Sequence, residues 1–281
     1  MASAAPLPAP EIDLRSKWPA IALIGLATGV ISGLLGIGGA AVLVPGLVDV
    51  LGVNQHRASG TSLFVIVPTA FVSAVVYALS AQTDWGLVVL FSVTAMLGAT
   101  AGARAMTRVS ALNLRRLFGV FLLFVAIRLL VPSAASPAGV SHVPVLAQDP
   151  AVTTAEGVLG LFAGFLSGLL GIGGGQVLTP GMIFLFDVPQ KVAQGISITF
   201  IVPTAISGAY THYRRGNVLP GVGILLVPCS VVGGILGAWG AQHAPAQLLR
   251  VGFGLFLLYG SARMLAPSLV TRFLRRVGRG A

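Results

Sequence analysis

The amino-acid sequence predicts an all-α polytopic membrane protein of two inverted repeats, each a glycine-broken helical hairpin followed by three transmembrane helices. Three observations lead to this fold class. Hydrophobic residues make up 56% of the 281 residues and charged residues only 9%, too little charge for the surface of a soluble domain. The octapeptide at 32–39 recurs unchanged 135 positions later, at 167–174. Finally, this topology collects most of the Lys and Arg residues on one face of the membrane.

The first half of the chain begins with a charged tail and continues as the first repeat. Residues 1–17 carry charges of mixed sign, which predicts a retained tail rather than a cleavable signal peptide. Residues 18–132 form the first transmembrane repeat. Its first apolar segment enters the membrane and ends at the glycines at 36–39, and the next segment returns to the starting side as the second limb of a hairpin. Because consecutive glycines cannot sustain a regular helix, the hairpin is expected to be broken inside the membrane. Three apolar stretches of spanning length follow, at 61–79, 85–103 and 114–131.

The second half has the same organisation. Residues 133–154 are rich in Pro, Ala and Ser and contain no Lys or Arg, which predicts an extracytoplasmic linker. Residues 155–267 form the second repeat, whose glycine break is followed by apolar stretches at 196–210, 218–241 and 248–265. Residues 268–281 form a basic C-terminal tail with four arginines.

The two repeats align without a gap. Matching residues at the 135-residue offset include Pro45 and Pro180, Gly60 and Gly195, Ser62 and Ser197, Pro68 and Pro203, Gly98 and Gly233, Arg115 and Arg250, and Arg128 and Arg263. A register held over such a length indicates an internal duplication.

The positions of the basic residues predict the orientation. A hairpin that enters and returns on one side gives each repeat an odd number of crossings, so that the second repeat is inverted. Most basic residues then fall on one face, including Arg15, Lys17, Arg57, Arg104, Arg108, Arg214, Arg215 and the C-terminal arginines. The positive-inside rule makes this face, with both tails, cytoplasmic and places the protein in the cell membrane. Two short full crossings in place of the hairpin would put the basic residues on the same face of the membrane.

The paired breaks are the predicted substrate site. Interrupted helices at matching positions of two repeats mark binding sites near the bilayer midplane in secondary transporters. The second limb of each hairpin points the positive end of its helix dipole at the break, which favours an anion. Close helix packing is the alternative role of these glycines. The predicted substrate-binding glycines are Gly36, Gly38, Gly39, Gly171, Gly173, Gly174 and Gly175.

Polar side chains near the breaks are further candidates. Hydroxyl and amide groups suit an oxyanion, although in membrane helices they also bond to their own backbone or to a neighbouring helix. The predicted substrate-binding side chains are Thr61, Ser62, Gln176, Gln194, Ser197 and Thr199. The predicted gating residues are the mid-helix prolines Pro68 and Pro203 and the matched arginines Arg128 and Arg263, for which snorkelling to the lipid interface is the alternative.

The motif Gly-Leu-Leu-Gly-Ile-Gly-Gly-Gly-Gln at 168–176, followed by Thr179-Pro180, and its partner at 33–40 with Pro45 resemble the TauE/SafE family of sulfite and organosulfonate exporters. The resemblance covers about Trp18 to Pro267 and implies transport of sulfite, thiosulfate, a sulfonate or another small organic anion. The first copy departs from the fuller pattern, having Ala40-Ala41 where the second has Gly175-Gln176, and Val44 where the second has Thr179. If these positions contact substrate, the two halves bind it unequally.

Other function classes fit the composition less well. The chain lacks a Gly-Lys-Ser/Thr phosphate loop, so secondary transport is expected rather than ATP-driven pumping, and coupling to a proton is one mode that remains. Only seven acidic residues are present, and Glu11, Asp13, Asp84, Asp149 and Glu156 are expected in tails or loops. Dispersed histidines and a single cysteine, Cys229, suggest no metal site, no cofactor and no enzyme. A channel or a metal-cation carrier is the nearer alternative.

Overall fold

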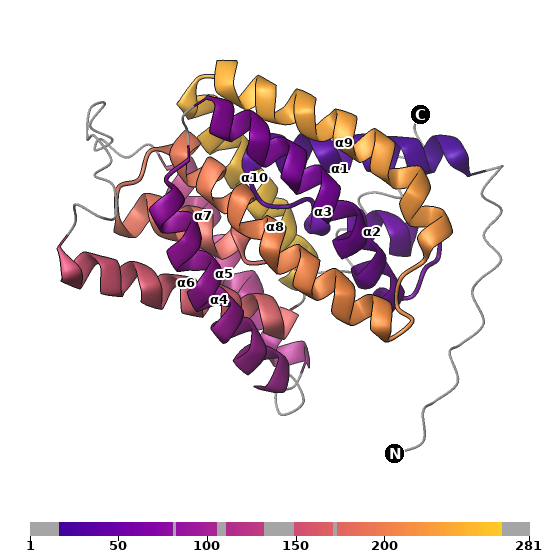
Figure 1. Cartoon of the computed structure of the whole chain (residues 1–281), viewed down its shortest axis with the longest axis horizontal. Helices are drawn as coiled ribbons and strands as arrows, with labels where there is room; N and C mark the ends of the chain where they lie inside the picture. Colours follow the sequence, from indigo (N-terminus) through magenta and orange to yellow (C-terminus); the bar gives the residue numbers. More distant parts are fainter. Residues whose placement is uncertain (1–16, 81–82, 106–110, 132–148, 171–172, 266–281) are drawn as a thin grey trace.

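The computed structural model describes residues 17–80, 83–105, 111–131, 149–170 and 173–265, and within these residues the chain is helical and contains no strand (Figure 1). The predicted all-α class is therefore confirmed. The tails at 1–16 and 268–281, most of the predicted linker and Gly171 lie outside the described residues. The helices are α1 (Trp18–Leu35), α2 (Ala40–Asp49), α3 (Gln55–Leu79), α4 (Trp85–Ala105), α5 (Ala111–Leu130), α6 (Pro150–Leu170), α7 (Gly175–Leu185), α8 (Gln190–Arg214), α9 (Pro220–His243) and α10 (Ala246–Leu265).

Helix lengths separate membrane-spanning elements from the hairpin limbs. Seven helices in the described part of the chain are long and apolar enough to cross a membrane, namely α1, α3, α4, α6, α8, α9 and α10. By contrast, α2 and α7 have 10 and 11 residues, which at 1.5 Å per residue gives about half of a 30 Å hydrocarbon core. Their length favours a half-membrane hairpin over two full crossings.

Helices of one repeat pack against helices of the other. Helix α1 of the first repeat packs along α9 of the second, and α6 packs along α4 (Figure 1). Both interfaces depend on glycine. A Cβ at Gly29 would collide with the carbonyl of Ser230, and a Cβ at Gly164 would collide in the same way with Ala95. Since these two contacts are related by the 135-residue offset, the two interfaces are copies of one another.

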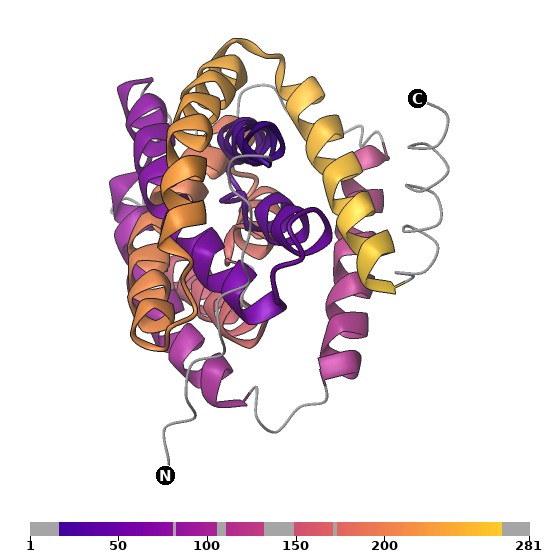
Figure 2. The same ribbon diagram turned by 90° about the vertical axis from the view of Figure 1, so that its right-hand side faces the viewer.

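Equivalent helices of the two repeats run antiparallel. Helix α3 packs on α8 with Gly60 beside His212 at one end and Tyr77 beside Gln194 at the other. Helices α5 and α10 lie side by side along one edge of the bundle (Figure 2), with Gly119 against Leu265 and the matching Gly254 against Leu130. Antiparallel pairing of equivalent helices is the relation that inverted repeats require. Their inversion across a membrane stays a prediction, which this pairing supports.

The close contact of α1 with α9 gives a testable prediction about stability. Changing Gly29 to alanine should lower the apparent melting temperature in detergent, because the added Cβ meets the backbone of Ser230 and Gly234 and overpacking costs about 1–3 kcal/mol. The matched control is Gly252→Ala in α10, where a Cβ meets nothing within 4 Å and should be neutral or stabilise by up to about 1 kcal/mol. Equal melting temperatures of the two variants would contradict the proposed role of Gly29.

Candidate functional site

The first glycine break is a left-handed turn held against α8. Gly36 ends α1 with φ +66°, and Gly38 and Gly39 follow with φ +79° and +60°. Residues with a Cβ rarely adopt these angles. A Cβ at Gly36 would lie 2.7 Å from the carbonyl oxygen of Gln194, so glycine is also needed for the close approach of the two backbones.

The two breaks meet on the same part of α8. A Cβ at Gly175 would lie 3.1 Å from the Cα of Ile37, which belongs to the break of the other repeat. The Cδ1 atom of Ile201 would lie 2.9 Å from a Cβ at either Gly38 or Gly175. The paired breaks therefore converge in the interior, as the sequence predicts for a shared site.

The second break differs from the first in the space before it. Gly173 has φ +84°, and a Cβ there would meet no atom of the described residues within 4 Å, its chain neighbours apart. At the equivalent Gly38, the corresponding space is filled by Ile201. Gly174 begins α7 and lies against the ring of Phe200, while Gly171 lies outside the described residues. Among the described residues, the space that a Cβ would occupy is thus free at Gly173 and filled at Gly38.

Several buried polar groups surround these breaks without a hydrogen-bond partner among the described residues. On α8 these are the Nε2 of Gln194 and the Oγ of Ser197, and the Ser197 hydroxyl would lie 2.9 Å from a Cβ at Gly175. Gln194 and Ser197 are both fully buried. The Oε1 of Gln194 lies 3.3 Å from the hydroxyl of Tyr77, which also donates to the Gly33 carbonyl at 2.9 Å. Buried donors of this kind call for a bound partner such as water or an anion.

Further hydroxyls lie beside the breaks; sequence reasoning missed Thr28 and Ser32, whereas Thr179 belongs to the motif of the second repeat. Thr28 and Ser32 lie one turn apart on α1 and pack against Gly39, and Thr179 lies on α7 beside Pro180. All three are buried, and their hydroxyls have no hydrogen-bond partner in the described structure. The signal available in the sequence was the spacing of Thr28 and Ser32, which puts both on the helix face that ends at the break.

Other predicted polar candidates have structural partners or lie elsewhere. Thr199 donates to the carbonyl of Gly195 at 2.7 Å, the backbone-bonded alternative for a membrane threonine. Thr61 accepts from the N–H of Leu219 at 3.0 Å, away from the breaks. Ser62 is fully buried, and its hydroxyl has no partner among described residues. Gln176 lies in the first turn of α7 and is 3% exposed.

The predicted gating arginines make equivalent contacts with different chemistry. Arg263 in α10 forms an ion pair of 2.6 Å with Asp49, the last residue of α2. Arg128 in α5 lies over the ring of Phe184 in α7, with Cζ 5.9 Å from the ring centroid. The 135-residue offset relates Arg128 to Arg263 and Asp49 to Phe184. Each contact therefore joins the last helix of one repeat to the short hairpin helix of the other, and we call these two contacts the latches.

The predicted gating prolines lie within long helices beside threonines. After Pro68, the hydroxyl of Thr69 donates to the Val65 carbonyl at 2.8 Å and lies 2.8 Å from the Ser230 hydroxyl on α9. After Pro203, Thr204 donates to the Ile201 carbonyl at 2.9 Å. Both threonines thus satisfy carbonyls near a proline, where the regular helix ladder is interrupted.

One charge-related prediction is wrong. Glu156 was expected in a loop, but it lies on α6 and is 1% exposed. The reason is that α6 begins at Pro150, inside the predicted linker, so that Glu156 falls in its second turn. The described residues contain no group of three His, Cys, Asp or Glu side chains that could hold a metal ion.

Comparison with known proteins identifies relatives over most of the chain. A family model described as "Sulfite exporter TauE/SafE" matches residues 2–129 and 157–280. "Probable membrane transporter protein YunE" of Bacillus subtilis is 30% identical over 235 residues, covering 78% of this chain and 86% of that protein. "Probable membrane transporter protein MJ0441" of Methanocaldococcus jannaschii is 27% identical over 230 residues, covering 79% and 83%.

A plant relative also matches. "Sulfite exporter TauE/SafE family protein 5" of Arabidopsis thaliana is 29% identical over 109 residues, covering 38% of this chain and 24% of that protein. No solved structure matches significantly. Together with the seven apolar helices, the matches confirm the prediction of a multi-pass membrane transporter rather than an enzyme.

Proposed function

Because the chain belongs to the sulfite exporter TauE/SafE family, we propose that it is a secondary transporter of a small anion, with sulfite, thiosulfate or an organosulfonate as cargo. The observation that carries this proposal is the convergence of both glycine breaks on one buried part of α8, beside donor groups that have no hydrogen-bond partner among the described residues. Transport would proceed by alternating access at these paired breaks.

The chemistry of the site favours an oxyanion. The hydroxyls of Ser197, Thr179 and Ser32 and the amide nitrogen of Gln194 can all donate hydrogen bonds. Helices α2 and α7 both begin at the breaks, so their first-turn N–H groups and positive dipole ends point toward the same region. A sulfur oxyanion offers several acceptor oxygens in one small group and would satisfy several of these donors at once.

We place the anion at the second break rather than midway between the two. Space is open before Gly173, whereas Ile201 fills the space before Gly38. The amide Gln176 and the hydroxyl Thr179 also belong to the second copy, and the first copy has Ala41 and Val44 in their places. The sequence difference between the two halves therefore lies in the proposed binding site, where only the second half supplies these polar side chains.

The latches supply two gates at opposite ends of the molecule. Lys17, His56 and Arg215 lie toward one end, because Gly25 of α1 packs on Leu226 in the first half of α9, and Gly60 near the start of α3 packs on His212 near the end of α8. Asp49 precedes α3 at this same end. We assign this basic end to the cytoplasm, as the positive-inside rule requires, so that the Asp49–Arg263 latch is the cytoplasmic gate and the Arg128–Phe184 latch the outer one.

Proteoliposome flux tests the proposed function. Protein reconstituted in liposomes loaded with labelled sulfite, thiosulfate or sulfoacetate should release at least one of them with saturable kinetics, and acetate should compete weakly. Parallel current recordings on a solid-supported membrane distinguish electrogenic from electroneutral transport. Saturable flux of a divalent cation, with none of a sulfur anion, would overturn the proposal in favour of a cation carrier.

A further inference from the structure

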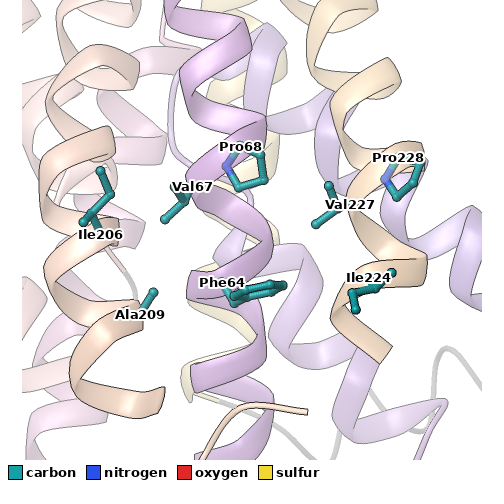
Figure 3. A pocket seen from close by; sticks show the side chains of 8 residues that line it. All are labelled: Phe64, Val67, Pro68, Ile206, Ala209, Ile224, Val227 and Pro228. Atoms are coloured by element: carbon teal, nitrogen blue, oxygen red, sulfur yellow. The ribbon is translucent and has the colours of Figure 1, made fainter. Parts of the chain in front are cut away.

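An apolar groove opens on the outside of the bundle where three helices meet. Its volume is about 560 Å³. It is lined by Phe64 and Pro68 of α3, Ile206 and Ala209 of α8, and Ile224 and Pro228 of α9, among others (Figure 3). Ile206 and Ile224 are 52% and 62% exposed, so the groove is open at the side of the bundle. It joins helices of both repeats, because α3 belongs to the first and α8 and α9 to the second.

The groove lies at the depth of lipid acyl chains. Five residues separate Ala209 from Arg214 and eight separate His56 from Phe64, which at 1.5 Å per residue puts the groove about 8–12 Å from the basic end of the bundle. In Figure 3, Phe64, Ala209 and Ile224 form the side of the groove that leads toward these helix ends. Half of a 30 Å hydrocarbon core is about 15 Å, so this position lies within one leaflet, between its headgroup layer and the bilayer midplane.

The nearby helix ends offer positive charge at headgroup level. Arg214 and Arg215 are exposed at the end of α8. Tyr210 and Tyr213 are each 63% exposed on the last turns of α8, where an aromatic belt is expected at a membrane interface. The three helices that line the groove carry no Asp or Glu at all. The region therefore complements an anionic headgroup above an apolar chain.

We propose that this groove binds an acyl chain of an anionic phospholipid whose phosphate contacts Arg214 and Arg215. The lipid would bridge the two repeats at their α3–α8 contact. This site is distinct from the glycine breaks and does not rest on the transported substrate, because its lining is apolar and faces outward.

Native mass spectrometry of the full chain in detergent tests the site by lipid titration. The probes are phosphatidylglycerol and phosphatidylcholine with identical palmitoyl and oleoyl chains. The wild-type protein should bind phosphatidylglycerol about tenfold more tightly, a preference that corresponds to one charge-assisted contact. The double variant Arg214→Gln/Arg215→Gln should lose this preference while it still binds both lipids.

Groove variants test the acyl-chain contact separately from the headgroup. Ile224→Trp on α9 and Ala209→Trp on α8 should each weaken binding of both lipids, because indole fills the groove. Ile127→Trp on α5, at a side chain that is 50% exposed away from the groove, is the matched control and should bind like wild type.

Three results would overturn the proposal. One is equal binding of the two lipids by the wild-type protein, and another is undiminished binding by both groove variants. The third is a dimer that Ile224→Trp dissociates whatever lipid is present, which would identify the groove as a contact between two copies of the chain. Since no flux is measured, failure here leaves the proposed transport function untouched.

Discussion

Replacing Gly173 by leucine should reduce sulfite flux about 5- to 150-fold, the effect of overpacking a binding site by about 1–3 kcal/mol. Apart from its chain neighbours, a Cβ at Gly173 meets no atom of the described residues within 4 Å, so that the side chain would occupy the space at the second break where we place the anion. The left-handed backbone at Gly173 adds about 1–2 kcal/mol of strain for any residue with a Cβ. Flux in proteoliposomes, normalised to folded protein, is the measurement.

A matched glycine separates this strain from loss of the site. Gly216, in the turn between α8 and α9, has φ +70°, and a Cβ there also meets nothing within 4 Å. Gly216→Leu therefore imposes the same kind of backbone strain at a position away from the breaks, and its flux should stay within about threefold of wild type, the scale of a surface substitution. If Gly173→Leu transports as well as Gly216→Leu, the open space is not the substrate site.

The repeated glycine motif made the breaks predictable from sequence. Consecutive glycines cannot be accommodated in a regular helix, and the matching copies at 36–39 and 171–174 implied two breaks related by symmetry. The structure shows left-handed angles at Gly36, Gly38, Gly39 and Gly173. That both breaks would meet at Ile201 could not be foreseen, because an isoleucine in an apolar helix has no distinguishing pattern.

Helix partners were not predictable for a physical reason. In a bilayer, hydrophobicity does not drive one helix toward another, so packing depends on small residues and local fit. The repeat register matched Gly98 with Gly233, but it did not indicate that Gly29 would meet Ser230 or that Gly164 would meet Ala95. Likewise, the charge of Glu156 favoured a loop, but α6 begins at Pro150 and includes this residue in its second turn.

The polar candidates show where residue type alone misleads. Thr199 and Ser197 lie two residues apart on α8, yet only Thr199 bonds to its own helix backbone, while the Ser197 hydroxyl faces Gly175 without a partner among described residues. The direction of a hydroxyl depends on rotamer and on the packed neighbour, and neither is encoded in the local sequence. Candidate sites in membrane helices therefore need the structure to sort them.

Asp49→Arg should reduce flux about 5- to 30-fold, and the charge-swapped double variant Asp49→Arg/Arg263→Asp should restore most of it. The substitution replaces an ion pair of 2.6 Å by two like charges at the proposed cytoplasmic gate. With both side chains part exposed, the change is worth about 1–2 kcal/mol, which is 5- to 30-fold in the equilibrium between closed and open gate. A transporter whose cytoplasmic gate cannot close cannot expose its site to the other side.

The two latches also predict an asymmetry between the gates. Salt screens a part-exposed ion pair, so that raising the ionic strength should open the Asp49–Arg263 latch more than the Arg128–Phe184 latch, which depends on the face of a ring. Phe184→Asp supplies the matched test, since it gives Arg128 the partner that Arg263 already has and should make the outer gate equally sensitive to salt. If the two gates differ in strength, the transporter at rest would mostly keep its site open to one side of the membrane.

If the charge-swapped variant is as inactive as Asp49→Arg, the ion pair does not act as a gate, and both arginines are then better explained as anchors at the lipid interface.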